Sequence, residues 1–191
     1  MFRTLLALAV VTACVYGQGA PKCVAPREWT SYVLENDPSR RLQIFGKLYY
    51  DSTKQSTLLV GEADGIEIAV YRIFPDKKEY IINQIEETCE SYELTRQWRP
   101  FEVDPSAFYG GTYYLGSADV VGDGVRVSHW YTRFGGDTLF QSIVNTTVVD
   151  CIPVQDYFYS QATGFVSTNF FDVTIQEIPD NIFAVPPICT K

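Results

Sequence analysis

Residues 57–74 read TLLVGEADGIEIAVYRIF and hold two apolar runs on either side of Asp64-Gly65. Asp-Gly is a favoured two-residue turn between antiparallel strands. After the turn, Ile66, Ile68 and Val70 alternate with the residues between them, as they do in a strand that buries one face. The stretch therefore predicts a β-hairpin.

The same pattern extends along most of the chain. In residues 41–51, RLQIFGKLYYD, one face of a strand would carry Leu42, Ile44, Leu48 and Tyr50. Further turn signals recur at Pro75-Asp76, residues 122–124, residues 135–137 and Thr163-Gly164. They predict nine to eleven strands, whereas helix signals are confined to short pieces such as residues 179–183. Strands joined by tight turns run antiparallel, so we expect two sheets packed face to face or a closed barrel, either of which can hold a cavity.

The N-terminus has the pattern of a secretory signal peptide. Arg3 precedes an apolar run from Leu5 to Val15, and small residues stand where a signal peptidase cleaves, which favours cleavage before Gln18. The run is shorter than the ~20 apolar residues that a membrane span needs. A rival interpretation is that VTAC, ending at Cys14, is the lipobox of a bacterial lipoprotein. We expect a signal peptide over residues 1–17 and one domain over residues 18–191.

The net charge and the composition of the chain bear on its fold and on the partners it can bind. The chain carries a net charge of −8, and its aromatic content of 15% favours β-structure and large apolar contacts. An acidic chain is a poor candidate for binding nucleic acid, so we expect no nucleic-acid partner. Acidity suits solubility and a diffuse attraction for cations.

Four cysteines remain once Cys14 is removed with the signal peptide: Cys23, Cys89, Cys151 and Cys189. An even number suits a disulfide framework in an oxidising compartment, and four cysteines allow three connectivities. Asn145-Thr146-Thr147 is the one N-x-S/T sequon of the sequence, so Asn145 is the expected glycosylation site. Because a glycan needs a solvent-facing side chain, we expect Val144 and Val148 to point inward.

Catalytic and metal-binding patterns are absent from the sequence. His129 is the only histidine, and its neighbour Ser128 would point to the opposite face of a strand. No G-x-S-x-G elbow, phosphate loop or dinucleotide fingerprint occurs, and Asp119 and Asp123 lack the spacing of a calcium loop. We therefore expect that the protein is not an enzyme and that it requires no cofactor.

Several segments together resemble the ependymin family. They lie in the family's order and span nearly the whole mature chain: CVAPREW from Cys23, YYDSTKQ from Tyr49, CESYELTRQWRPFEV from Cys89, DCIPVQDYFY from Asp150, STNFFDV from Ser167 and DNIFAVPPIC from Asp180. The combination is far more specific than any one segment. The chain is thus identified by resemblance as an ependymin-related protein.

The resemblance implies a disulfide pairing. In this family the cysteine of the C-x-A-P segment pairs with that of D-C-x-P, which corresponds to Cys23 with Cys151. The cysteine before W-x-P pairs with the one after the terminal Pro-Pro, which corresponds to Cys89 with Cys189. The sequence lacks both cysteines of a third bridge that vertebrate members carry.

The resemblance also implies a fold and a function. The expected fold is mostly β, with two curved antiparallel sheets forming a sandwich or half-barrel around an apolar pocket. The expected function is non-catalytic binding of a hydrophobic ligand, such as a lipid or fatty acid, by a secreted homodimer. Calcium association is possible by resemblance alone. The alternative is an acidic component of an extracellular or calcified matrix, although the sequence has no Asp-rich run.

Overall fold

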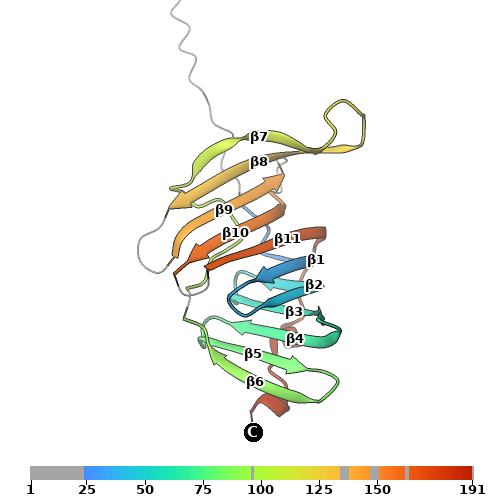
Figure 1. The fold of residues 1–191 in the computed structure, drawn as a ribbon, viewed down its shortest axis with the longest axis vertical. Helices are drawn as coiled ribbons and strands as arrows, with labels where there is room; N and C mark the ends of the chain where they lie inside the picture. Colours follow the sequence, from blue (N-terminus) through green and yellow to red (C-terminus); the bar gives the residue numbers. More distant parts are fainter. Residues whose placement is uncertain (1–23, 96, 134–137, 147–150, 162–163, 191) are drawn as a thin grey trace, which may run out of the picture.

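The computed structural model describes residues 24–95, 97–133, 138–146, 151–161 and 164–190. Eleven strands and two short 3₁₀ helices form within these ranges (Figure 1). The strands are β1 (Glu28–Asp37), β2 (Leu42–Asp51), β3 (Ser56–Ala63), β4 (Ile66–Ile73), β5 (Lys78–Asn83), β6 (Thr88–Glu93), β7 (Phe108–Gly116), β8 (Gly124–Arg133), β9 (Thr138–Thr146), β10 (Pro153–Ser160) and β11 (Gly164–Ile175). The 3₁₀ helices are η1 (Asp180–Phe183) and η2 (Pro187–Cys189), and η1 confirms the short helix expected over residues 179–183.

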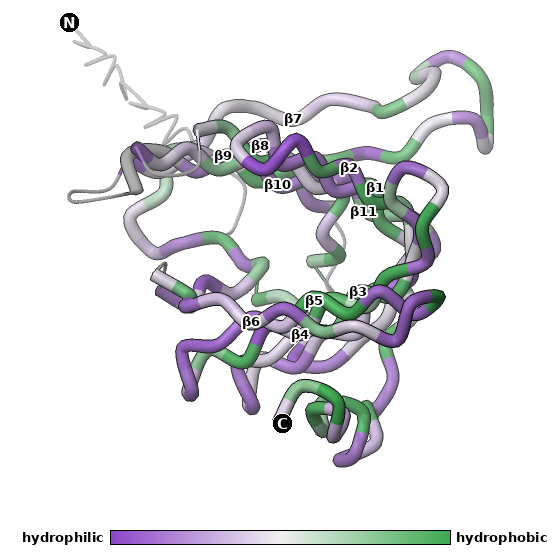
Figure 2. Tube along the Cα trace, turned by 60° about the horizontal axis from the view of Figure 1, so that its bottom comes forward, coloured by the Kyte–Doolittle hydropathy of each residue, from purple (hydrophilic) through white to green (hydrophobic). Residues whose placement is uncertain are grey.

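All described strands belong to one antiparallel sheet. Its order is β6-β5-β4-β3-β2-β1-β11-β10-β9-β8-β7, so two meanders of sequential strands meet where β1 pairs with β11. Figure 2 shows the sheet folded over, with β3 to β6 facing the layer that contains β7 to β10. The sequence predicted two sheets, and the structure has one continuous curved sheet whose two meanders face each other. The mostly β, antiparallel fold class is confirmed.

The quoted hairpin forms as predicted. β3 and β4 pair from Ser56–Ile73 to Ala63–Ile66, and the two residues between the strands, Asp64 and Gly65, have φ of 51° and 81°. Two consecutive positive φ values are the signature of a type I′ turn, whose twist matches that of paired strands.

A glycine pair lies where β2 meets β3, next to the bend of the sheet. Gly46 is opposite Gly61, and a Cβ added at Gly46 would lie 2.3 Å from the carbonyl oxygen of Val60. No side chain fits at this approach of two backbones. The pair allows the first meander to bend back over the second.

Strand alternation separates an inner face from an outer face. Ile44, Leu48 and Tyr50 are buried on the inner face, as the sequence predicts, and belong to a cluster that includes Trp29 and Phe170. On the outer face of β3 to β6, η1 and η2 cover a second cluster that contains Leu58, Ala69, Ile82, Ile178 and Phe183. The C-terminal segment thus closes one outer surface, and the inner face remains for a site between the halves.

Candidate ligand-binding site

Three rings from different strands form the floor of the space between the halves. Trp29 of β1 stacks on Tyr50 of β2 with ring centroids 4.7 Å apart, and it meets Phe170 of β11 edge-on at 5.5 Å. All three lie at inward positions and are at most 6% exposed. Burial raises the pKa of the Tyr50 phenol, so its hydroxyl stays protonated.

Residues 94–107, here called the crossover segment, run across this floor. They connect β6 to β7, the two opposite edges of the sheet, so the chain must pass from one edge to the other. Trp98 stacks on Tyr50 at 5.5 Å, and Phe101 packs edge-on against Phe170 at 4.9 Å. Further along, Val103 and Ala107 join a cluster with Trp130 and Ile143 under the β7–β11 half. The segment therefore occupies the middle of the concave face.

A cavity of about 60 Å³ remains between the crossover segment and the sheet. Its wall is mixed in character. The apolar lining is Leu48, Phe74, Trp98, Phe101, Phe158 and Val166, and the polar lining is Glu35, Thr57, Arg72, Gln97, Arg99, Gln141, Asp156 and Thr168.

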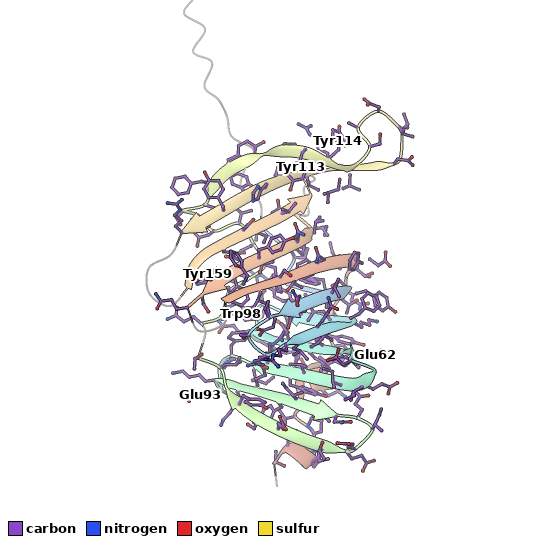
Figure 3. All side chains as sticks on the ribbon, viewed as in Figure 1. Glu62, Glu93, Trp98, Tyr113, Tyr114 and Tyr159 are labelled. Carbon is purple, nitrogen blue, oxygen red and sulfur yellow. A yellow bond between two sulfur atoms is a disulfide. The ribbon has the colours of Figure 1, made fainter. Side chains whose placement is uncertain are left out.

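A wider groove of about 490 Å³ opens on the other side of Trp98. It shares Phe74, Gln97 and Trp98 with the cavity, and Figure 3 shows Trp98 with Glu93 of β6 below it. Its remaining lining is Gln55, Lys77, Glu93, Leu94 and Thr95. Trp98 thus lies between a small, partly aromatic cavity and a larger, mostly polar groove.

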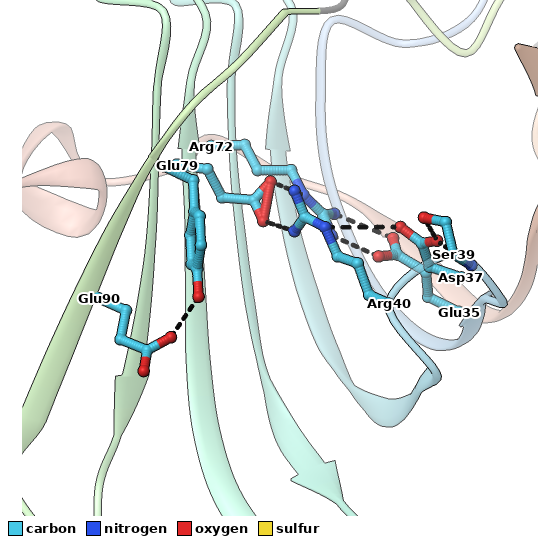
Figure 4. Close-up of polar contacts among 8 residues, drawn as sticks. Glu35, Asp37, Ser39, Arg40, Arg72, Glu79 and Glu90 are labelled. Atoms are coloured by element: carbon cyan, nitrogen blue, oxygen red, sulfur yellow. Dashed lines mark hydrogen bonds and ion pairs between the residues drawn. The ribbon is translucent and has the colours of Figure 1, made fainter. Parts of the chain in front are cut away.

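One end of the cavity is ionic (Figure 4). Arg72 donates from Nη1 to Glu35 Oε2 at 2.9 Å and from Nη2 to Glu35 Oε1, while its Nε lies 3.6 Å from Glu79 Oε2. Arg40 bonds the other oxygen of Glu79. Burial alone would lower the pKa of Arg72, but the charges of Glu35 and Glu79 outweigh it and raise that pKa. Arg72 is therefore a permanent cation that neutralises two inward carboxylates.

The opposite wall carries a second polar group. Gln141 of β9 donates to Asp156 of β10 at 2.9 Å, and both are buried. Arg99 of the crossover segment lies beside them in the cavity wall. Burial lowers the pKa of Arg99, and the charges of Asp156 and Asp104 only partly offset this. The cavity therefore has polar groups at both ends of an aromatic middle.

The sequence points to these polar residues less clearly than to the rings. Arg72 is in phase with Ile68 and Val70 on the inner face of β4, and this alternation in the sequence indicates that its charge faces inward. The role of Trp98 and Phe101 has no local signal, since it depends on which strands form the edges of the sheet.

One of the two predicted disulfides lies wholly within the described residues. Cys89 of β6 is bonded to Cys189 of η2 with their Cα atoms 5.3 Å apart, which confirms this pairing. The bridge fastens the C-terminal segment to the outer face. Cys151 is also disulfide-bonded and fully buried, but its predicted partner Cys23 lies outside the described residues.

The expectation that Asn145 faces solvent is wrong. Its side chain is 0% exposed, and Nδ2, the atom that would carry a glycan, donates to Cys151 Sγ at 3.0 Å. Asn145 is in phase with Ile143, which packs with Trp130, so Asn145 lies on a buried face of this strand. Val144 is buried as well, and Val148 lies outside the described residues. Burial of Nδ2 argues against the glycan that the sequon predicts.

His129, the one candidate for a catalytic base, pairs with a serine across the sheet. Its Nε2 lies 2.7 Å from Ser142 Oγ, whereas Ser128 bonds to Thr112 instead. Burial lowers the pKa of His129.

Across the described ranges, no group of three His, Cys, Asp or Glu side chains is placed to hold a metal ion, so Asp119 and Asp123 form no such group there. None of the helices in these ranges has the length and apolar character of a bilayer-spanning helix.

The chain is similar in sequence to one protein family and in fold to a solved structure. Residues 64–189 match the model of the ependymin family. Mammalian ependymin-related protein 1 of Rattus norvegicus is 25% identical over 178 residues, which cover 90% of this chain and 78% of that protein. Ependymin of Clupea harengus is 26% identical over 151 residues, covering 75% and 70%. The crystal structure of an uncharacterized conserved protein from Thermus thermophilus shares the fold, with a TM-score of 0.52, 9% identity and coverage of 85% and 86%.

Proposed function

The chain belongs to the ependymin family, and from that premise we propose that it is a secreted, non-catalytic protein that binds one hydrophobic ligand, a lipid or fatty acid, on the concave face of its sheet. The observation that carries the proposal is the aromatic floor made by Trp29, Tyr50 and Phe170. Binding sites for small apolar molecules are concave and mostly apolar, with a few polar groups that fix orientation. The aromatic floor supplies such an apolar surface beneath Trp98 and Phe101, and the cavity beside it adds polar groups that could fix orientation.

Secretion is supported by the covalent structure. A bridge such as Cys89–Cys189 forms and persists in an oxidising compartment. The apolar run from Leu5 to Val15 supplies the expected signal peptide.

A homodimer is the assembly that the family resemblance implies, and we place its interface on the outer face near the centre of the sheet. Tyr32 and Phe45 stack there at 6.2 Å, and Phe171 is the register partner of Tyr32. All three are between 46% and 55% exposed. A second copy of the chain would cover an apolar surface that is unusual for a monomer.

The alternative function, an acidic matrix component with calcium association, is favoured by one observation. Glu86, Glu87, Glu90 and Glu93 gather along the β6 edge of the sheet and are exposed. Their arrangement would attract cations diffusely, without coordinating one ion.

Two neighbouring positions on β11 provide the test of ligand binding. Val166 is 4% exposed and lines the cavity, whereas Phe165 points outward and is 58% exposed. Val166→Trp should fill the cavity and abolish saturable binding of a fluorescent fatty-acid analogue, and Phe165→Trp should leave it unchanged. Circular dichroism would check that both variants are folded, since overpacking costs roughly 1–3 kcal/mol. Equal binding by both variants would refute this location.

A further inference from the structure

The cavity is too small for the ligand that the protein is proposed to bind. Its volume of about 60 Å³ holds no more than a few water molecules. Pockets that bind drug-sized molecules measure roughly 300–1,000 Å³. The open groove, at about 490 Å³, falls in that range, but most of its lining is polar.

Trp98 is the partition between these two spaces. It lines both, together with Phe74 and Gln97. Its ring is held by a stacking contact with Tyr50 at 5.5 Å and an edge contact with Phe74 at 5.0 Å. Movement of this one ring would join the cavity to the groove.

The segment that carries Trp98 packs on the sheet through its side chains. Residues 97–103 form no strand or helix, so no ladder of backbone hydrogen bonds fixes them to the sheet. The backbone N–H of Phe101 donates a long hydrogen bond of 3.4 Å to the Tyr50 hydroxyl. Displacing these residues would break ring contacts but would leave every strand pair of the sheet intact.

We propose that Trp98 is the gate of the binding site. The ligand enters through the groove, the rings of Trp98 and Phe101 leave the aromatic floor, and the apolar chain of the ligand takes their place against Tyr50, Trp29 and Phe170. The inference rests on the proposed function, because it assumes that the concave face binds an apolar ligand.

The groove also indicates the chemistry of the other end of the ligand. Among the described residues of its lining, Lys77 and Glu93 are the charged ones, one of each sign, and Gln55 and Thr95 add neutral hydrogen-bonding groups. Such a lining suits a head group that carries both charges or none. The proposed ligand class is therefore a single-chain amphiphile with a zwitterionic or uncharged head.

Tryptophan fluorescence of the wild-type protein tests the gate directly. The chain has three tryptophans, of which Trp29 and Trp130 are 0% and 2% exposed. Titration with lysophosphatidylcholine, kept below its micelle concentration, should raise acrylamide quenching about twofold as Trp98 leaves its contacts. Trp98→Phe should abolish that rise. Saturable binding with unchanged or reduced quenching would overturn the gate and leave the proposed function standing. Failure of both lysophosphatidylcholine and the fluorescent fatty-acid analogue to bind saturably would overturn both.

Association kinetics provide a second test. Trp98→Ala removes the two ring contacts that the ligand must break, so association should be about tenfold faster, while Trp98→Phe should stay near the wild-type rate. Phe165→Ala, on the outer face, is the control and should change nothing. Wild-type kinetics in the alanine variant would contradict the gate.

A fatty acid of equal chain length should bind about tenfold more weakly than lysophosphatidylcholine, and equal affinity would refute the assigned head group.

Discussion

Replacing Arg72 with methionine should destabilise the protein more than any comparable change at a surface arginine. The side chain of Arg72 is 8% exposed, and those of its partners Glu35 and Glu79 are 11% and 3% exposed. Arg72→Met keeps most of the volume but leaves two inward carboxylates without their central cation. Removing one partner of a buried pair costs about 3–5 kcal/mol in the free energy of unfolding.

Arg40→Met is the matched control. Arg40 also bonds Glu79, but its side chain is 36% exposed, so solvent screens the pair and the loss should stay at or below about 1 kcal/mol. The double variant Arg72→Met/Glu35→Gln should recover part of the loss, since it removes one of the two carboxylate charges that lose the guanidinium of Arg72. Urea unfolding at pH 7 measures all of these free energies.

The loss in the free energy of unfolding that Arg72→Met causes should also depend on pH. In the wild type the pKa of Arg72 is raised, so Arg72 stays charged at every pH at which the protein is folded. Without Arg72, protonation of a carboxyl group relieves the burial of negative charge that the guanidinium no longer offsets. The folded variant then binds more protons than the unfolded chain, so its deficit should shrink as the pH falls from 7 towards 4. A loss equal to that of Arg40→Met, or one that is constant with pH, would refute the reasoning.

Three further predictions concern other parts of the molecule. Replacing Cys89 and Cys189 by alanine should cost about 2–5 kcal/mol, seen as a lower melting temperature, because the bridge closes a loop with a sequence separation of 100; an unchanged melting temperature would contradict this. Deglycosidase treatment of the secreted protein should leave its mass unchanged, because Asn145 Nδ2 is buried; a mass loss of one glycan would show otherwise. Phe45→Asp should convert a dimer to a monomer in analytical ultracentrifugation, and a persistent dimer would place the interface elsewhere.

Local patterns in the sequence were sufficient for the strands and turns. Asp64-Gly65 specifies its hairpin because the turn type requires two positive φ values, and the alternation around Ile44 and Leu48 marks an inner face. The family motifs indicated the Cys89–Cys189 pair, which residue spacing alone could not have chosen among three connectivities.

Asn145 shows the limit of such patterns. Alternation in residues 143–145 determines which side chains share a face, but not whether one face or both are buried. Ile143, Val144 and Asn145 are all at most 3% exposed, and the face of Asn145 is covered where Ile143 packs against Trp130 of β8. That contact is remote in sequence, so the predicted exposure of Asn145 was wrong.

The crossover segment shows the same limit at the scale of the fold. The sequence contains Trp98 and Phe101 in a recognisable family motif, but their place on the concave face follows from the pairing of β1 with β11. That pairing makes β6 and β7 opposite edges and directs their connection across the sheet. Strand order is a global property that no local stretch encodes.

Native mass spectrometry of the protein secreted from eukaryotic cells tests the central claim most directly. We expect each chain to carry, or to take up on addition, one apolar amphiphile, released when the protein is unfolded. Wild-type chains that neither retain nor bind such a molecule at a stoichiometry of one, while Val166→Trp behaves identically, would contradict the account of the concave face as a ligand-binding site.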